Sequence, residues 1–292
     1  DFDLPSIKTD LKNLDPSEDV MVWFGHSSLF IQISGKKVLV DPVFSKYASP
    51  VPFTNKAFKG TNVYDVDDLP EIDILLITHD HYDHLDYPTI KKLKDKVSKV
   101  IVPLGVDAHL LRWGYDEDKI TTVDWDDEVI IDDNLKIYAL EARHFSGRSF
   151  FNRNQSLWVS YLIEEKISNK NYKLFLSGDG GYSGRFKEFK ERFGKIDLAT
   201  MESGQYNKEW SLIHFKPEDV LMASQDMEVE NLLPIHNSKF KLSNHTWDDP
   251  LKRLDELTKN TNIKLLTPII GEKIYLHKEN SFSKWWENIE NK

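Results

Sequence analysis

The chain consists of short apolar runs that alternate with longer amphipathic segments. Short runs rich in β-branched residues and bounded by polar turns are typical of buried strands. Such runs begin at Met21, Leu29, Val38, Ile74, Val100, Val129, Leu135, Leu157, Leu174, Leu198, Leu232 and Ile274. Apolar residues at helical spacing predict helices over residues 87–97, 106–113, 184–193, 216–227 and 248–259. Strands in meanders with helices between them predict an α/β protein of two mixed sheets covered by outer helices.

Two segments do not fit this alternation. Residues 42–66 contain three prolines and few helical signals, so we expect an excursion over the functional site rather than a part of the core. Phe282, Trp285 and Trp286 lie near the C-terminal end, where we expect them to pack a short tail helix rather than to form a membrane belt. The 292 residues, of which 40% are hydrophobic, suit one large α/β domain spanning residues 1–292.

Four side chains that can bind a metal lie within the hexapeptide His-Asp-His-Tyr-Asp-His at residues 79–84. In extended backbone, residues two apart point the same way, so His79 and His81 can bind one cation together. Asp83 and His84 follow as the chain turns and offer an oxygen and a nitrogen to a second cation. Imidazole and carboxylate without thiolate suit zinc, and also manganese, iron or nickel. A histidine-rich solvated turn is the alternative interpretation of the hexapeptide.

Three further candidate ligands follow apolar segments elsewhere in the chain. His144 comes after the strand-like residues 135–142, Asp179 after residues 173–178, and His236 after residues 231–235. Loops that carry function emerge from a rigid sheet at such strand ends. Each residue taken singly also fits a boundary histidine or a turn aspartate. Their combination with the hexapeptide favours a metal site.

These positions together resemble the ligand series of the metallo-β-lactamase superfamily, in its order and approximate spacing. Residues 23–28, 143–148 with 152–158, and 178–182 extend the likeness to one branch of that superfamily. The branch includes N-acylphosphatidylethanolamine-hydrolysing phospholipase D and, more distantly, the ascorbate-phosphate lactonase. With Val40-Asp41-Pro42 and Ile235-His236 added, the resemblance covers about residues 20–245.

The resemblance implies a four-layer αββα sandwich in which two mixed β-sheets are flanked by helices. It also implies two divalent metal ions, with zinc expected and manganese, iron or nickel as alternatives. One ion is then held by His79, His81 and His144, the other by Asp83, His84 and His236, and Asp179 bridges the two. The implied reaction is phosphodiester hydrolysis by a metal-bridging hydroxide, as in the phospholipases. Hydrolysis of a lactone or another ester is the alternative.

Further residues are expected to act around this centre. Asp83 and His214 are the predicted catalytic residues. His214 resembles a histidine near the phosphate site of the phospholipases. The alternative is that His214 is only a neighbour of a helix N-cap. Asp41 is expected to orient a ligand histidine, with an ordinary Asx-Pro turn as the alternative. His26 can reach the site from an early strand, although a buried structural histidine is favoured.

Substrate contacts are expected from the segments that resemble the phospholipases and from nearby aromatic residues. The predicted substrate-binding residues are Arg148, Asn152, Tyr182 and Tyr206. An apolar channel for an acyl chain is one interpretation of the aromatic residues near the ligands, and ordinary core packing is the other. These aromatic residues are Phe145, Phe150, Phe151, Tyr182, Tyr206 and Trp210.

Three departures from the phospholipase pattern lie beside ligands. Asn152-Arg153-Asn154 stands where that branch has Asp-Arg-Asn. This chain has Gly178-Asp179-Gly180-Gly181 where the phospholipases have Gly-Asp-Thr-Gly. After the last ligand it has Asn237-Ser238 where they have Trp-Gly. The departures leave the predicted metal ligands in place and put the identity of the substrate in question.

Composition and charge narrow the set of partners. A net charge of −10 disfavours nucleic acid and anionic bilayers as partners. It therefore also disfavours the function of a nuclease of the same superfamily. The absence of cysteine excludes disulfides, a thiolate metal site and a cysteine nucleophile. No apolar run reaches the roughly eighteen residues of a membrane span. A non-catalytic protein with a relic site is disfavoured because the set of seven ligands is complete.

The predicted metal centre itself indicates the kind of substrate. Two divalent ions, two carboxylates and one hydroxide leave about one net positive charge, which favours an anionic substrate group. We therefore expect a small-molecule or lipid substrate with an anionic group, no nucleic acid and no transmembrane segment, with a homo-oligomer left open. The expected location is the cytoplasm, although the chain begins at Asp1 and a signal or lipid anchor upstream is compatible with that.

Overall fold

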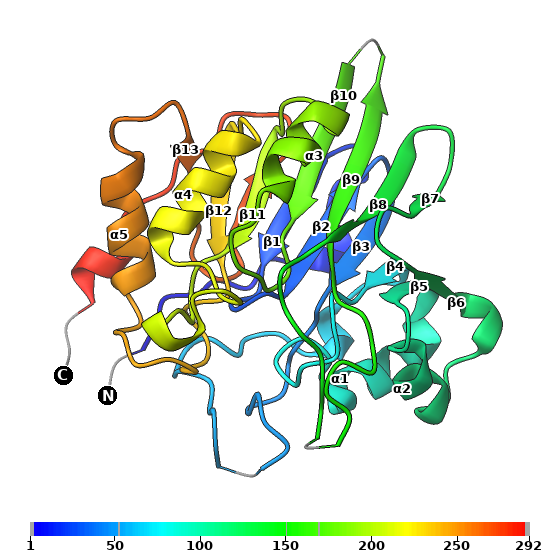
Figure 1. Cartoon of the computed structure of the whole chain (residues 1–292). Helices are drawn as coiled ribbons and strands as arrows, with labels where there is room; N and C mark the ends of the chain where they lie inside the picture. Colours follow the sequence, from blue (N-terminus) through cyan, green and yellow to red (C-terminus); the bar gives the residue numbers. More distant parts are fainter. Residues whose placement is uncertain (1–2, 52, 150, 169, 290–292) are drawn as a thin grey trace.

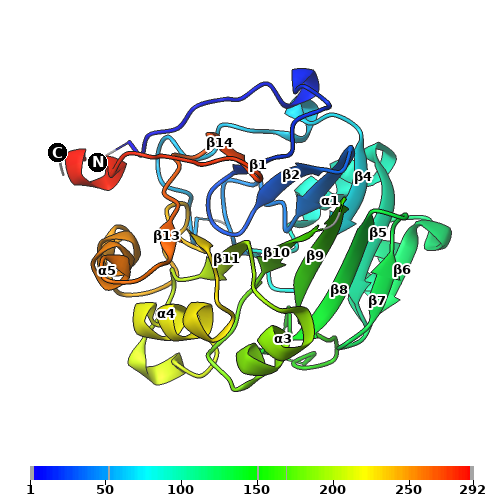
Figure 2. The same ribbon diagram turned by 90° about the horizontal axis from the view of Figure 1, so that it is seen from above.

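The computed structural model describes residues 3–51, 53–149, 151–168 and 170–289. Within these residues the strands form two seven-stranded sheets that lie face to face, with helices along the two outer sides (Figures 1 and 2). The first sheet has the order β14-β1-β2-β3-β4-β5-β6 and the second has the order β13-β12-β11-β10-β9-β8-β7. The predicted two-sheet sandwich with outer helices is confirmed.

The strands agree with the predicted apolar runs. Those of the first sheet are β1 (Val20–Trp23), β2 (Leu29–Ile33), β3 (Lys36–Val40), β4 (Ile72–Leu76), β5 (Val97–Pro103), β6 (Ile120–Val123) and β14 (Lys273–Tyr275). Those of the second are β7 (Glu128–Ile130), β8 (Leu135–Glu141), β9 (Val159–Ile167), β10 (Lys170–Leu176), β11 (Leu198–Glu202), β12 (Asn231–Ile235) and β13 (Lys264–Leu265). Only β6 and β13 were not predicted, because β6 is half polar and β13 has two residues.

All five predicted helices are confirmed, with slightly shorter bounds. They are α1 (Tyr87–Leu93), α2 (Asp107–Arg112), α3 (Arg185–Phe193), α4 (Pro217–Asp226) and α5 (Asp249–Thr258). Short 3-10 turns lie at η1 (Leu11–Asn13), η2 (Val66–Asp68), η3 (Lys94–Lys96), η4 (Glu117–Lys119), η5 (Lys208–Trp210) and η6 (Trp285–Asn288). The first predicted helix was too long because residues after Leu93 tighten into η3 and Val97 already belongs to β5. No helix of the described residues is long and apolar enough to cross a membrane.

The core has three layers because central strands bury both of their faces. Ile74 and Leu76 of β4 belong to the cluster between the sheets, whereas Leu75 and Ile77 belong to the cluster under α1 and α2. A third cluster joins the outer face of the second sheet to α3, α4 and α5. Burial on alternate sides explains why such strands are continuously apolar rather than alternating.

Both irregular segments are placed as expected. The described residues between 42 and 65 lie in no helix or strand, Val66 begins η2, and Ala48, Ser49, Pro50 and Asn55 line a cavity over the candidate ligands. Trp285 and Trp286 begin the short turn η6 and are buried in one cluster with Leu4 and Leu251. The C-terminal aromatic pair is thus a packing anchor, as predicted.

Candidate metal centre

The predicted ligands gather where strands of both sheets end. The hexapeptide follows β4, His144 follows β8, Asp179 follows β10 and His236 comes directly after β12. The neighbours β3, β4 and β5 run parallel, as do β10, β11 and β12. Since parallel strands end at the same edge of a sheet, their loops meet at one end of the sandwich. This topology brings together ligands that lie far apart in the sequence.

The hexapeptide turns sharply after its first histidine pair. The carbonyl of His81 accepts hydrogen bonds from the amides of His84 (3.1 Å) and Leu85 (2.8 Å). The guanidinium of Arg148 donates to the carbonyls of Asp80 and Leu85, each at 2.7 Å. These bonds fix the loop in a conformation in which all four candidate ligands point into the same site.

The first group of ligand atoms comprises His79, His81, His144 and Asp179, whose nitrogen and oxygen atoms lie within 4.8 Å of one another. His79 Nε2 lies 2.9 Å from His81 Nδ1, and His144 Nε2 lies 3.2 Å from the same nitrogen. Asp179 Oδ2 is 3.9 Å from His79 Nε2 and 3.8 Å from His144 Nε2. Three imidazoles and one carboxylate therefore converge on one point.

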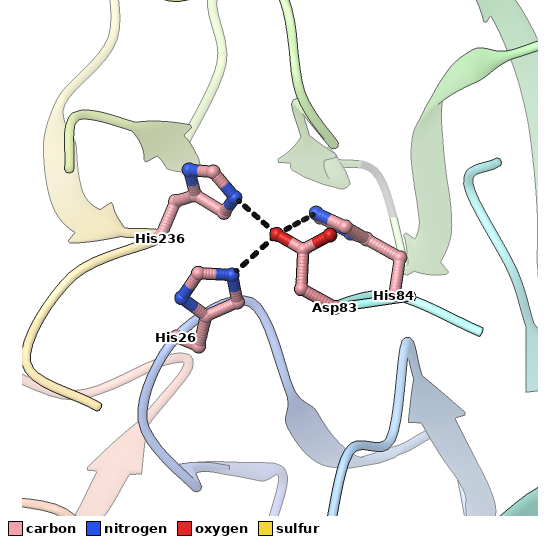
Figure 3. Close-up of side chains that lie close together, drawn as sticks. All are labelled: His26, Asp83, His84 and His236. Carbon is pink, nitrogen blue, oxygen red and sulfur yellow. Dashed lines mark hydrogen bonds and ion pairs between the residues drawn. The ribbon is translucent and has the colours of Figure 1, made fainter. Parts of the chain in front are cut away.

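The second group comprises His26, Asp83, His84 and His236 (Figure 3). Asp83 Oδ2 lies 2.9 Å from His26 Nε2, 3.1 Å from His236 Nε2 and 3.7 Å from His84 Nε2. Asp179 also reaches this group, because Oδ1 is 3.1 Å from His84 Nε2 and Oδ2 is 3.2 Å from His236 Nε2. Asp179 is thus the carboxylate that contacts both groups.

Several of these atoms are buried without a hydrogen bond, which tests whether a metal fits the site. His84 Nε2 and Asp179 Oδ1 are both buried without a hydrogen-bond partner, although they lie only 3.1 Å apart. Leaving a buried polar atom unpaired costs about 1–3 kcal/mol. A divalent cation bound by imidazole nitrogen and carboxylate oxygen would satisfy such atoms. The donor set therefore fits a buried metal centre.

The pKa values of the histidines differ between the two groups. Burial and the neighbouring imidazoles lower the pKa of His79 well below its usual range, and burial does the same to His144. Both rings are therefore neutral at pH 7 and able to bind a metal. Burial also opposes charge on His236, but the carboxylates of Asp179, Asp83 and Glu202 prevail and raise its pKa to about 10. The carboxylates around His84 likewise outweigh burial and raise its pKa well above the usual value.

The second ring nitrogen of several histidines also has a partner. His84 Nδ1 lies 2.7 Å from Asp41 Oδ2, so Asp41 contacts a candidate ligand as expected. Asp41 is itself held by the amide and hydroxyl of Thr78, at 2.8 and 2.6 Å. His144 Nδ1 lies 2.9 Å from the carbonyl of Ile213. Such partners fix the orientation of the ring and raise the basicity of the ligand.

Backbone strain is concentrated at the centre. His26, Asp41 and His236 have φ angles of 54°, 40° and 65°, in the left-handed region that non-glycine residues rarely adopt. Two hydrogen bonds stabilise this conformation, because the amide of His26 donates to Asn237 (2.9 Å) and the amide of His236 donates to His26 (2.8 Å). His26 is buried, as the favoured prediction of a structural histidine requires. Its ring also contacts the candidate ligand Asp83 directly.

Glu202 is a buried site residue that the sequence reasoning missed. Its Oε1 lies 2.8 Å from His214 Nδ1 and 3.4 Å from His236 Nδ1. Its Oε2 accepts a hydrogen bond from the amide of Gly180 (3.0 Å). Burial tends to lower the pKa of His214, but the Glu202 carboxylate outweighs burial and the pKa is raised. A glutamate that ends the apolar strand β11 was the available sequence signal.

A cavity of about 470 Å³ lies over the centre. Its floor includes His81, Asp83, Asp179, His236 and His214. Its other lining residues are mostly apolar or uncharged, namely Ala48, Ser49, Pro50, Asn55, Tyr82, Phe145, Gln205, Trp210, Ile213 and Leu242. Lysine and arginine do not occur among the described residues that line it. An anionic group in this cavity would therefore meet the histidines and any bound metal rather than a basic side chain.

The four residues predicted to bind substrate do not line this cavity. Arg148 holds the hexapeptide, and Asn152 Oδ1 accepts hydrogen bonds from the amides of Arg148 and Ser149. The hydroxyl of Tyr182 donates to Asp226, and that of Tyr206 donates to Asp249. Each polar end is engaged elsewhere, so the geometry gives these four no direct contact with the cavity.

The aromatic residues predicted to form an apolar channel divide into two sets. Phe145 and Trp210 line the cavity. Tyr182 and Tyr206 do not, and Phe151 is 91% exposed outside it. Phe150 lies outside the described residues. Two aromatic side chains thus contribute to the apolar wall, together with aliphatic residues that the sequence did not single out.

Comparison with known proteins agrees with this geometry. Residues 36–237 match the family described as the beta-lactamase superfamily domain. An uncharacterized protein of Mycobacterium tuberculosis is 33% identical over 97% of this chain and 76% of its own length. The mitochondrial N-acyl-phosphatidylethanolamine-hydrolyzing phospholipase D of Saccharomyces cerevisiae is 34% identical over 80% of this chain, which spans 51% of that protein.

A solved structure supports the fold independently of sequence. The metallo hydrolase Igni18 of Ignicoccus hospitalis has a TM-score of 0.62 at 17% identity, covering 87% of this chain and 97% of its own. The matched region contains the hexapeptide, His144, Asp179 and His236. With its αββα fold and its buried histidine and aspartate clusters, the chain belongs to the metallo-β-lactamase superfamily and is a metal-dependent hydrolase.

Proposed function

We propose that this protein is a dinuclear phosphodiesterase whose substrate carries an apolar group beside the scissile phosphate. The observation that carries this proposal is the cavity, which combines a floor of imidazoles and carboxylates with a largely apolar wall. The activity for which the yeast relative is named, hydrolysis of N-acyl-phosphatidylethanolamine, is of this chemical class. A neutral amide would gain less from a positive centre than a phosphodiester does.

The two groups of ligand atoms would each hold one divalent ion, with zinc expected. His79, His81 and His144 would bind the first, and Asp83, His84 and His236 the second, with Asp179 between them. The contacts of Asp179 with both groups support this bridging position. When bound, two divalent ions supply Lewis acidity and a water nucleophile at neutral pH.

His214 is proposed to donate a proton to the leaving group as a general acid. It lines the cavity, and its Nδ1 is paired with Glu202, so Nε2 is the nitrogen left for the substrate. The raised pKa keeps a larger protonated fraction at neutral pH than an ordinary histidine has. A positioned imidazolium can protonate the departing oxygen, a contribution of about 10²–10⁴ in rate. Glu202 acts through His214 by fixing its tautomer and orientation.

The apolar wall would hold the nearest part of an acyl chain. Pro50, Trp210, Ile213 and Leu242 come from the irregular segments around the cavity mouth. About 470 Å³ encloses a drug-sized ligand, so most of a two-chain lipid would lie outside the cavity. The same compact volume favours the second candidate function, hydrolysis of a lactone or another small ester.

The first prediction concerns the metal content. Wild-type protein reconstituted with zinc should hold two zinc ions in its histidine and aspartate centre, and Asp179→Asn should hold more than one zinc per chain fewer than wild type, because both groups lose a shared ligand. Dialysis and elemental analysis measure the content, and circular dichroism checks folding. Asp133→Asn, at an exposed aspartate, is the matched control and should keep the wild-type content. Full metal content in Asp179→Asn would place the bridge elsewhere.

The second prediction is that zinc binding releases protons at pH 7. His84 and His236 have raised pKa values, so both rings carry a proton before the metal binds and must lose it. Affinity should therefore fall as the pH is lowered, by about tenfold per pH unit for each proton released. Calorimetry in two buffers of different ionisation enthalpy measures the number of protons. Equal observed heats in both buffers would contradict the assignment.

The third prediction concerns substrate class. The zinc-loaded protein should hydrolyse bis-p-nitrophenyl phosphate and, with higher kcat/KM, an N-acyl phosphatidylethanolamine presented in detergent. Chelation should abolish both activities, and added zinc should restore them. The same preparation is assayed with a set of lactones. Turnover of lactones without turnover of either diester would reject the phosphodiesterase proposal in favour of its alternative.

The fourth prediction separates His214 from the metal ligands. His214→Ala should retain its metal and lower kcat about 10²–10⁴-fold for diesters with poor leaving groups, but much less for p-nitrophenyl esters. Glu202→Gln should shift the same leaving-group dependence in the same direction by a smaller factor. His245→Ala is the control, because that ring stacks on Tyr206 outside the cavity. An equal loss for good and poor leaving groups would rule out a general acid.

A further inference from the structure

A second cluster of metal-capable side chains lies at the opposite end of the sandwich. Asp19 immediately precedes β1, His277 follows β14, and Glu165 lies near the end of β9. Val20 pairs with Tyr275 and Glu165 pairs with Tyr172, so these residues lie where β1 and β10 begin. The candidate catalytic ligands instead follow the last residues of β4, β10 and β12. Figure 1 shows the β9–β10 hairpin projecting away from the loops that carry those ligands.

The three side chains converge on one point. His277 Nε2 lies 3.1 Å from Asp19 Oδ2 and 3.0 Å from Glu165 Oε2. Only the contact with Asp19 has hydrogen-bond geometry, and Glu165 Oε2 is buried without a hydrogen bond. The same combination, close but not hydrogen bonded, occurs between His84 Nε2 and Asp179 Oδ1 in the candidate metal centre. It is the arrangement of atoms that aim at a common point rather than at each other.

Each carboxylate is anchored through its other oxygen. Asp19 Oδ1 accepts a hydrogen bond from the amide of Ser34 (2.9 Å), and Glu165 Oε1 accepts one from the hydroxyl of the same serine (2.8 Å). Glu165 is only 3% exposed. Tyr172 packs its ring against His277, with centroids 4.5 Å apart, and its buried hydroxyl has no hydrogen-bond partner. Preoriented oxygens and buried polar atoms without a hydrogen bond together point to a ligand.

We propose that Asp19, Glu165 and His277 bind one divalent cation of the zinc type, separate from the catalytic centre. Imidazole nitrogen and carboxylate oxygen are both zinc ligands, and water from the adjoining cavity of about 930 Å³ can complete the coordination. Ligand atoms about 2.0–2.1 Å from a tetrahedral zinc are roughly 3.3 Å apart, close to the 3.0 and 3.1 Å between these atoms. The divalent charge would balance the two carboxylates.

The cation would link the two sheets. Asp19 and His277 flank strands of the first sheet, whereas Glu165 belongs to β9 of the second. The role is therefore structural, because none of these residues lines the catalytic cavity. Without metal, the hydrogen bond to the Asp19 carboxylate and the nearby Glu165 carboxylate raise the pKa of His277 to about 9, so an imidazolium ion pair is the competing state and binding displaces one proton.

Zinc content in matched variants tests the proposal. Full-length wild type, Glu165→Gln, His277→Gln and Glu279→Gln are equilibrated with zinc, dialysed and analysed for zinc per chain. Glu279 lines the same cavity, but its side chain is 96% exposed and lies outside the cluster, so Glu279→Gln is the control. We expect Glu165→Gln and His277→Gln to hold one zinc fewer than wild type and the control, with unchanged diesterase activity.

An anomalous difference map from zinc-soaked wild-type crystals locates the ion without any substitution. A peak at the three side chains supports the site even where one variant folds poorly. Equal zinc content in all four proteins, or a map without that peak, would overturn the proposal and leave the ion pair as the only occupant. Both readouts are independent of the catalytic centre, because they depend on a difference at one cluster and not on total activity.

Discussion

The contact of one buried carboxylate with two groups of histidines is the interaction on which the site depends. Asp179 follows β10 in the second sheet, lies within 3.2 Å of His84 and His236 of the second group, and lies 3.8 Å from His144 of the first. Burying a carboxylate without compensation is costly, so its imidazole partners must remain in place. Those partners come from loops after β4 of the first sheet and β12 of the second. The centre therefore couples the two sheets at the end of the sandwich where their loops meet.

Strain at this end is held by contacts rather than by glycine alone. Asp179 follows Gly178, whose φ of 58° would be unfavourable for other residues and whose added Cβ would lie 2.9 Å from that of Thr78. His26 and His236 also have positive φ angles, and each one's backbone is hydrogen bonded to the other's loop. Unusual backbone at several ligands is consistent with a site that is organised before a metal or substrate binds.

Much of the fold followed from the pattern of apolar runs, because strands buried on both faces and amphipathic helices leave clear periodicities. Strand β6 was not predicted, because it is half polar and only partly buried and so leaves no clear apolar run. The hexapeptide was informative because closely spaced ligands need little tertiary information. Glu202 and His214 are twelve residues apart and meet only through the packing of β11 and the loop after it. Their pairing could not be predicted from local spacing.

The substrate residues were the hardest to predict, for a reason visible in Arg148. Its segment resembles the phospholipases, but here the guanidinium donates to two carbonyls of the hexapeptide and lies 3.9 Å from the ring centroid of Tyr82. The sequence gives the type of a side chain but not the polar group to which it hydrogen bonds in the folded protein. The uncharged lining of the cavity comes instead mainly from Ala48, Ser49, Pro50 and Asn55 and from residues 205–213.

The departures beside the ligands can be understood in the same way. At the altered position Gly180 the backbone amide donates to Glu202, and an added Cβ would meet only ordinary contacts, whereas a Cβ on the shared Gly181 would lie 2.1 Å from the carbonyl of Leu212. Asn237 and Ser238 hydrogen bond to each other and do not line the cavity. The altered positions Gly180, Asn237 and Ser238 thus lie outside the lining of the cavity, whose wall comes from other segments. If the substrate binds in this cavity, as we propose, the wall segments rather than the residues flanking the candidate ligands would determine whether a diester or a lactone fits.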